Sequence, residues 1–281
     1  MSRIEFSPAS WPFSLPLERA VGPVQAEVDR LGSASQYGWG HTIDFGPFRK
    51  EGLLGEDYLA IAGVLDHFAF WPTRLDGMRV ADIGCFTGGL SLLMAHRGAE
   101  VVYALDEIPE HLAQCEFLAS TFEAKAVRPI LGTVYKIHEM IQPASLDLIL
   151  FAGVLYHLSD MLVGLHALRS LLKPGGLLII QSNAVEDFDH SYANFGRFFA
   201  GTWWQPTGLC IKDMCEHMGY ANPDVKFYGT NLCVGRAVRS SDEIPFRRGL
   251  NWSFDDLRDR RPRTLDWSIL APAPRLPPGK A

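Results

Sequence analysis

The sequence of 281 residues predicts an α/β fold, built as a doubly wound, mainly parallel sheet of seven strands with an antiparallel last strand. Three observations lead to this prediction. Apolar runs typical of buried strands alternate with helical patterns between residues 57 and 182. A glycine turn, Gly84 to Gly89, follows one of these runs and opens a helix. Two further apolar runs flank Gly229, as in an antiparallel hairpin.

Each element has a local signal. Gly77 and the glycine turn bound the apolar run at 78–84, which therefore predicts a buried strand. The helix expected at 161–172 carries leucines on one face, and the Lys-Pro-Gly-Gly sequence at 173–176 ends it. In full, we expect helices at 23–31, 58–70, 89–97, 110–122, 135–141, 161–172 and 207–218, and strands at 78–84, 101–105, 126–131, 146–154, 176–182, 225–228 and 232–238.

Three parts of the chain differ in composition. Residues 1–56 are expected to form an N-terminal cap, and their stretch 36–56, dense in aromatics and glycines, is typical of a loop or short strand that lines a site. Residues 57–238 form the main domain, with an insert at 183–205 that holds seven aromatic residues. Residues 239–281 read as a tail, with nine Lys and Arg against six Asp and Glu.

Composition excludes several classes of protein. A net charge of −6 disfavours a surface built to bind nucleic-acid phosphates, although it leaves room for a local basic patch. The five cysteines and nine histidines show no spacing typical of a metal site, so no metal is expected. The sequence has no pattern of a signal peptide or of a membrane helix. We therefore expect a soluble, cytoplasmic protein, with a homodimer left open.

The glycine turn is followed by an acidic residue at the end of the next strand. Asp106 lies 22 residues after Gly84, where a carboxylate can accept hydrogen bonds from both hydroxyls of a ribose. Gly84 and Gly88 allow close approach of the backbone to a ligand, and the amides that open the next helix suit an anionic group. A nicotinamide dinucleotide protein shares these features, but its second half-sheet is missing from this sequence.

These segments resemble the class I S-adenosylmethionine-dependent methyltransferase superfamily. The similarity lies in residues 80–89 as the first motif, Asp106 as the ribose acid, residues 146–154 as the fourth strand, and residues 171–176 as the entry to the fifth. It covers about residues 57–238 and implies S-adenosyl-L-methionine as the cofactor. It departs at Phe86, where the family usually has a small residue, so a tighter or shifted turn is expected there.

The resemblance implies a set of cofactor-binding residues. The turn amides would meet the methionine carboxylate, Asp82 the ammonium group, Asp106 the ribose and Thr133 the adenine. The complete set is Asp82, Gly84, Cys85, Phe86, Gly88, Asp106, Glu107, Thr133, Val134, Phe151 and Ala152.

The segment Gly153 to Asp160 follows a core strand, at the edge where open α/β sheets bind ligands. Methyl transfer needs in-line positioning and, for a hydroxyl or amine acceptor, removal of a proton. His157 is our candidate base and Tyr156 its neighbour in the catalytic site; the alternative is that both only form its wall. Expected contacts to the acceptor are Trp39, His41, Trp203 and Trp204.

A narrower resemblance, carried by Gly153-Val-Leu-Tyr-His, residues 39–44 and residues 203–207, is to the branch with the tRNA wobble-uridine carboxymethyltransferases. Those enzymes use a carboxylated cofactor, for which Arg49 or Lys50 with Tyr156 are the candidate partners. The acidic chain and the aromatic insert favour a small-molecule acceptor, such as a secondary metabolite. A tRNA-modifying enzyme is the second hypothesis, and a catalytically silent cofactor-binding subunit the third.

Overall fold

The computed structural model describes residues 5–196 and 201–240. The chain divides into two compact units, Met1–Ile244 and Pro245–Ala281, and all described residues belong to the first. Residues 197–200 of the expected insert and residues 241–281 of the expected tail lie outside the described residues.

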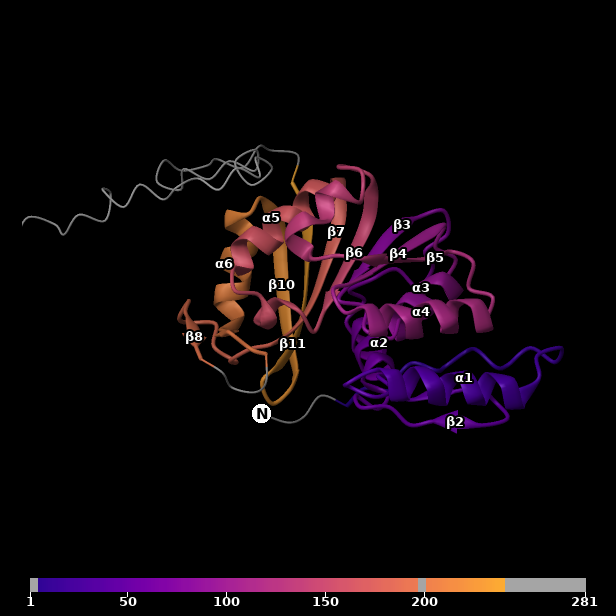
Figure 1. Cartoon of the computed structure of the whole chain (residues 1–281). Helices are drawn as coiled ribbons and strands as arrows, with labels where there is room; N and C mark the ends of the chain where they lie inside the picture. Colours follow the sequence, from indigo (N-terminus) through magenta and orange to yellow (C-terminus); the bar gives the residue numbers. More distant parts are fainter. Residues whose placement is uncertain (1–4, 197–200, 241–281) are drawn as a thin grey trace, which may run out of the picture. The chain divides into compact units, whose positions relative to one another are not determined.

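A seven-stranded sheet in the order β10-β11-β7-β6-β3-β4-β5 forms the centre of the first unit (Figure 1). The pairs from β7 to β5 are parallel, whereas β11 runs antiparallel to both β7 and β10. This confirms the predicted fold class. The strands are β3 (Arg79–Ile83), β4 (Val101–Asp106), β5 (Val127–Leu131), β6 (Leu146–Ala152), β7 (Leu172–Asn183), β10 (Tyr220–Gly229) and β11 (Leu232–Arg239).

Helices cover both faces of the sheet, because right-handed crossovers from β3 toward β5 and from β6 toward β7 lead to opposite faces. In Figure 1, α3 and α4 lie beside β3 to β5, and α5 and α6 lie beside β7 and β10. The helices are α1 (Val21–Ala34), α2 (Asp57–His67), α3 (Gly89–His96), α4 (Pro109–Thr121), α5 (Met161–Leu171) and α6 (Gly208–His217). Within the described residues, no helix is long and apolar enough to cross a membrane.

Three expected elements differ from the structure. The helix expected at 135–141 is a 3-10 helix, η1 (Val134–Glu139). Strand β7 begins at Leu172 and not at 176, since Leu172 already pairs with Leu146 and the Lys-Pro-Gly-Gly sequence forms an irregularity within the strand. Strand β10 begins at Tyr220 and not at 225, because it pairs with β11 as far back as Arg239, with a bulge between Ala221 and Asp224.

The N-terminal segment shares its core with the sheet domain. Ile43 and Phe45 are fully buried, and the Phe45 ring stacks on Phe122 beside α4, with 5.3 Å between ring centroids. The segment includes the short strands β1 (Ile43–Asp44) and β2 (Arg49–Lys50), so the loop expected at 36–56 contains one small hairpin. The insert contains a second one, β8 (Ala193–Phe195) with β9 (Trp204–Pro206).

Candidate functional site

The strand order reverses between β3 and β6, which are parallel neighbours. From β3 the chain proceeds through β4 to β5, and from β6 it proceeds the other way to β7. Ligands of open α/β sheets bind outside the carboxyl ends of the strands at such a reversal. The predicted site segments, the glycine turn after β3 and the loop after β6, both lie there.

The glycine turn has three residues in the left-handed region, Gly84 at φ +74°, Phe86 at φ +51° and Gly88 at φ +81°. A side chain at Gly84 would come within 2.3 Å of Val154, and one at Gly88 within 2.5 Å of Cys115 Sγ. Glycine is therefore required at both positions. The turn thereby packs closely against Val154, in the loop after β6, and against Cys115 of α4.

Phe86 adopts a left-handed backbone conformation that usually favours glycine. A left-handed conformation costs a residue with a side chain about 1–2 kcal/mol. The Phe86 ring packs at 4.2 Å between centroids from His111 and at 5.2 Å from His41, and its amide donates to Asp106 Oδ2 at 2.9 Å. These contacts offset the strain, so the turn departs from the family pattern in its residue and retains the backbone conformation that glycine would adopt.

Asp106 is anchored beside this turn, with only 7 % of its surface exposed. Oδ2 accepts from the Phe86 amide, while Oδ1 accepts from the Ile108 amide at 2.9 Å and lies 3.3 Å from His111 Nδ1. The carboxylate is held at the end of β4 by backbone donors on both sides. Glu107, the next predicted residue, is exposed.

Asp82 lies beneath the start of α3, almost fully buried in β3, and its Oδ2 accepts from Ser91 Oγ at 2.6 Å. Burial raises the pKa of Asp82 to about 7, and the charge of Asp106 raises it further while the Ser91 hydrogen bond opposes the shift. A cationic group nearby would favour the ionised carboxylate. Asp82 is thus chemically suited to an ammonium group, directly or through water.

The other predicted cofactor residues line the same edge at different depths. The Gly132 amide donates to the Asp106 carbonyl at 3.0 Å, which brings half-buried Thr133 and buried Val134 next to the end of β4. Ala152 is half-buried at the end of β6. The side chains of Phe151 and Cys85 belong to the core, with 0 % and 3 % exposed, and burial raises the pKa of the Cys85 thiol.

The N-terminal segment lies directly on the glycine turn. The His41 amide donates to Thr87 Oγ1 at 3.1 Å, and His41 Nδ1 lies 2.7 Å from the same oxygen. Gln114 of α4 accepts from the Gly40 amide at 3.2 Å and donates to the Gly38 carbonyl at 2.9 Å. Burial, with a smaller effect from His111, lowers the pKa of His41 to about 3, which keeps the imidazole neutral. His41 is therefore placed to support the turn.

The predicted acceptor contact Trp39 is buried with 4 % exposed, and its Nε1 has no hydrogen-bond partner among the described residues. It lines a hollow of about 400 Å³ together with Asp29, Lys50 and other residues of the segment. Of these two predicted acceptor contacts, Trp39 packs within the N-terminal segment and His41 contacts the glycine turn.

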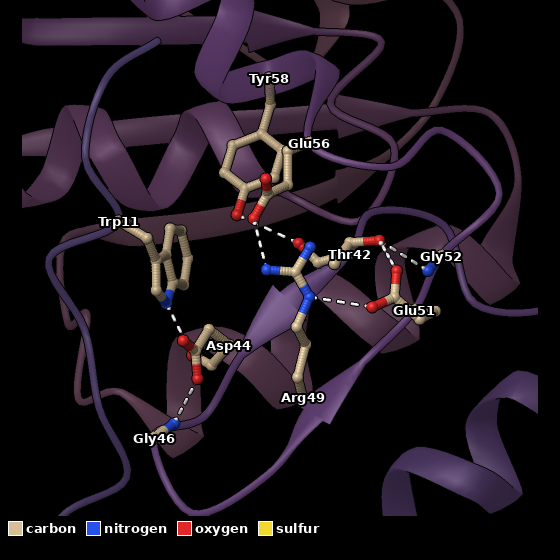
Figure 2. A network of polar contacts seen from close by, with 9 residues as sticks. All are labelled: Trp11, Thr42, Asp44, Gly46, Arg49, Glu51, Gly52, Glu56 and Tyr58. Atoms are coloured by element: carbon tan, nitrogen blue, oxygen red, sulfur yellow. Dashed lines mark hydrogen bonds and ion pairs between the residues drawn. The ribbon is translucent and has the colours of Figure 1, made fainter.

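The two cations considered for a carboxylated cofactor are paired with acids of this same segment. Figure 2 shows Arg49 between Glu51 and Glu56, with hydrogen bonds of 2.9 Å to each. Lys50 Nζ donates to Asp29 at 2.7 Å. Their positive charges are largely neutralised where they lie.

The loop after β6 holds Tyr156 and His157 in a short 3-10 helix, η2 (Leu155–His157), after Gly153 at φ +73°. His157 Nδ1 lies 2.8 Å from the Gly201 carbonyl. Because a carbonyl oxygen only accepts, Nδ1 carries the proton and the lone pair is on Nε2. This is the tautomer that a base acting through Nε2 requires.

The aromatic insert is fastened to this loop by two further hydrogen bonds. The Trp203 amide donates to the Tyr156 carbonyl at 3.0 Å, and Trp204 Nε1 donates to the Ser159 carbonyl at 3.1 Å. Trp203 is 40 % exposed, and its ring stacks on that of Phe195 at 6.2 Å between centroids and an interplanar angle of 30°. The structure therefore brings together Tyr156, His157, Trp203 and Trp204, whose predicted roles stay predictions.

A group of residues that the sequence did not indicate lies on the other side of Tyr156. Gln181 Nε2 of β7 donates to the Tyr228 hydroxyl of β10 at 3.1 Å. A Cβ on Gly153 would lie 3.8 Å from both Gln181 Oε1 and the Tyr156 hydroxyl. Burial chiefly raises the pKa of both phenols, and the negative charge of Asp57 raises each further. We call Tyr156, Gln181 and Tyr228 the tyrosine cluster.

No group of three His, Cys, Asp or Glu side chains in the described part of the chain is arranged to hold a metal ion.

Comparison with known proteins gives a family match. A family model described as "Methyltransferase domain" matches residues 74–218. Among curated relatives, a tRNA U34 carboxymethyltransferase of Photorhabdus laumondii is 29 % identical over 188 residues, which cover 63 % of this chain and 52 % of the relative. A ubiquinone biosynthesis O-methyltransferase of Cereibacter sphaeroides is 31 % identical over 162 residues, which cover 55 % of this chain and 62 % of the relative.

Among solved structures, the N-terminal domain of EvdMO1, in the presence of SAH and D-fucose, matches with a TM-score of 0.59 at 18 % identity, covering 79 % of this chain and 97 % of that one. This likeness supports the fold. The matched part of this chain spans 52 % and 62 % of the lengths of the two curated relatives.

Proposed function

We propose that this chain, which belongs to the methyltransferase domain family, is an S-adenosylmethionine-dependent enzyme that methylates a small molecule through a hydroxyl or amine group. The observation that carries the proposal is the aromatic insert fastened over the loop that holds Tyr156 and His157. Apolar walls with a few polar groups are typical of small-molecule sites.

The cofactor is proposed to lie along the glycine turn. There Asp82 would hold its ammonium group and Asp106 its ribose. When bound, the cofactor supplies a methyl group that is already activated by the positive sulfonium. Thr133 and Val134, next to the end of β4, are the proposed adenine contacts.

On the acceptor side, the protein's tasks are positioning and proton removal. Trp203 and Trp204 are proposed to hold the acceptor against the loop, and Tyr156 to orient its reacting atom. The proposed base is His157, through Nε2, since its Nδ1 is committed to the Gly201 carbonyl. In this role, His157 Nε2 would accept the proton that the attacking hydroxyl or amine loses.

The experiment is methyl transfer from isotopically labelled S-adenosylmethionine into a cell extract, separated into small-molecule and RNA fractions. Label in small molecules supports the proposal. Label that is released by ribonuclease supports the second candidate, a tRNA-modifying enzyme. Binding of the cofactor without transfer to either fraction would favour a silent cofactor-binding subunit.

The second candidate rests on the likeness to tRNA U34 carboxymethyltransferases. Against it, Arg49 and Lys50 are paired with acids, and the net charge of −6 gives RNA little general attraction. Salt-dependent binding of purified tRNA would favour it. The same charges lead us to propose that the ordinary cofactor, and not its carboxylated relative, is used.

A further inference from the structure

Asp57 is an acidic side chain at the site for which the proposed mechanism has no use. It is the first residue of α2, and the next residue, Tyr58, packs on the start of α3, where a Cβ on Gly89 would lie 2.7 Å from its ring. The first amides of α3 are those proposed to meet the methionine part of the cofactor. Asp57 therefore lies near that part of the site.

The Asp57 carboxylate has no hydrogen bond or ion pair among the described residues. Its neighbour Glu56 differs, because it is paired with Arg49 at 2.9 Å (Figure 2). Asp57 is exposed, and desolvation of its carboxyl by the protein around it raises the pKa of that group. An unpaired carboxylate at the rim of a cofactor site is available to a charge on the ligand.

The N-terminal stretch connects the start of α2, where Asp57 lies, with Tyr228 on the acceptor side of the site. The N-terminal stretch crosses from Tyr228, where the Phe6 ring packs at 6.0 Å between centroids, to α2, where the Ala9 amide donates to the Leu59 carbonyl at 2.9 Å. The start of α2 and the tyrosine cluster are thereby joined. The Tyr156 hydroxyl lies in this cluster above Gly153, at the end of β6.

We propose that Asp57 faces the transferred carbon and selects the cofactor by charge. It would favour S-adenosylmethionine, with its positive sulfonium, over S-adenosylhomocysteine and over carboxy-S-adenosylmethionine. This inference rests on the proposed function, since it requires the cofactor to lie on the glycine turn. S-adenosylmethionine carries a positive sulfonium that S-adenosylhomocysteine lacks. The carboxylated cofactor adds a negative charge on the transferred carbon, which Asp57 would repel.

The test is calorimetric titration of three ligands, S-adenosylmethionine, S-adenosylhomocysteine and carboxy-S-adenosylmethionine, into the full-length protein and its Asp57→Asn variant. We expect the variant to bind S-adenosylmethionine about tenfold more weakly and so to lose its preference over the carboxylated compound. Little change is expected for the carboxylated compound, whose sulfonium and carboxylate have opposite charges, and for the neutral sulfur of S-adenosylhomocysteine. The control is Glu56→Gln, which removes the same charge one residue away and should alter the relative affinities of the three ligands little.

Two outcomes would overturn the inference. An equal loss of affinity for all three ligands would place Asp57 at the ammonium group that they share. Unchanged affinities would place it outside the site. A wild-type protein that binds none of the three would instead contradict the proposed function, so the two failures are distinguishable.

Discussion

Replacing Asp106 by alanine should remove both of its roles, which are to hold the turn and to bind the ribose. Stability and cofactor affinity report on them separately. The carboxylate accepts hydrogen bonds from the Phe86 and Ile108 amides, both at 2.9 Å, in a largely buried place. Hydrogen bonds to a charged group contribute about 1.5–3 kcal/mol each. Because the two bonds share one side chain and the turn can relax, we expect Asp106→Ala to lower the free energy of unfolding by about 2–4 kcal/mol.

The effect on the cofactor is expected to be comparable. Loss of a charged acceptor for two ribose hydroxyls should weaken binding by about 2–4 kcal/mol, or roughly 30- to 700-fold in the dissociation constant. The measurement is calorimetric titration with S-adenosylhomocysteine, after denaturant unfolding has shown that the variant is folded. Glu110→Ala, which removes an exposed acid from the same region, is the control. An unchanged dissociation constant in a folded Asp106→Ala protein would refute the assignment of Asp106 to the ribose.

Four other outcomes are expected. His157→Ala should slow turnover by about 10²–10⁴-fold with nearly unchanged cofactor affinity; near-normal turnover at saturating acceptor, from pH 6 to 9, would make His157 a wall residue. Since Phe86 has φ +51°, Phe86→Gly should be more stable than Phe86→Ala by about 1 kcal/mol in denaturant unfolding, the reverse of the usual order. The pKa of His41 is about 3 in the folded protein and 6.5 in the unfolded chain, so only the unfolded chain gains a proton between these values. The free energy of unfolding should therefore fall as the pH is lowered from 6.5 toward 3. His41→Gln should make this dependence on pH less steep. Mass spectrometry of the copurified ligand should find S-adenosylmethionine or S-adenosylhomocysteine, and recovery of the carboxylated compound would reverse our choice of cofactor.

The parts of the fold that the sequence predicted well depend on short-range patterns. The strand that contains Asp82, the turn at Gly84 and the helix at Gly89 each leave a signal within a few residues, and the structure has all three where expected. Element ends were less predictable. The pairing of Tyr220 with Arg239 and of Leu172 with Leu146 depends on strands distant in sequence, so no local pattern revealed it.

Residues of the candidate site were likewise predictable only where a local sequence pattern marks them. Asp106 ends its strand and was found by spacing, whereas Gln181 and Tyr228 come from separate strands and meet only after folding. Thr87 and Gln114 were missed for a related reason. Their polar atoms bind the backbone of the N-terminal segment, and a single threonine or glutamine on a helix or turn gives no sign of such a partner.

The contact between the N-terminal segment and the glycine turn matters for how this protein can be shortened or recombined. A fragment that started near residue 74, where the family match begins, would lose His41 from Thr87 and Phe45 from Phe122, and would expose a face of α4 and an unsupported turn to water. The same holds for a chimera that joined the sheet of this protein to another enzyme's leading segment. Exchange of acceptor specificity between relatives would therefore have to move residues 36–58 and the turn they cover as one module.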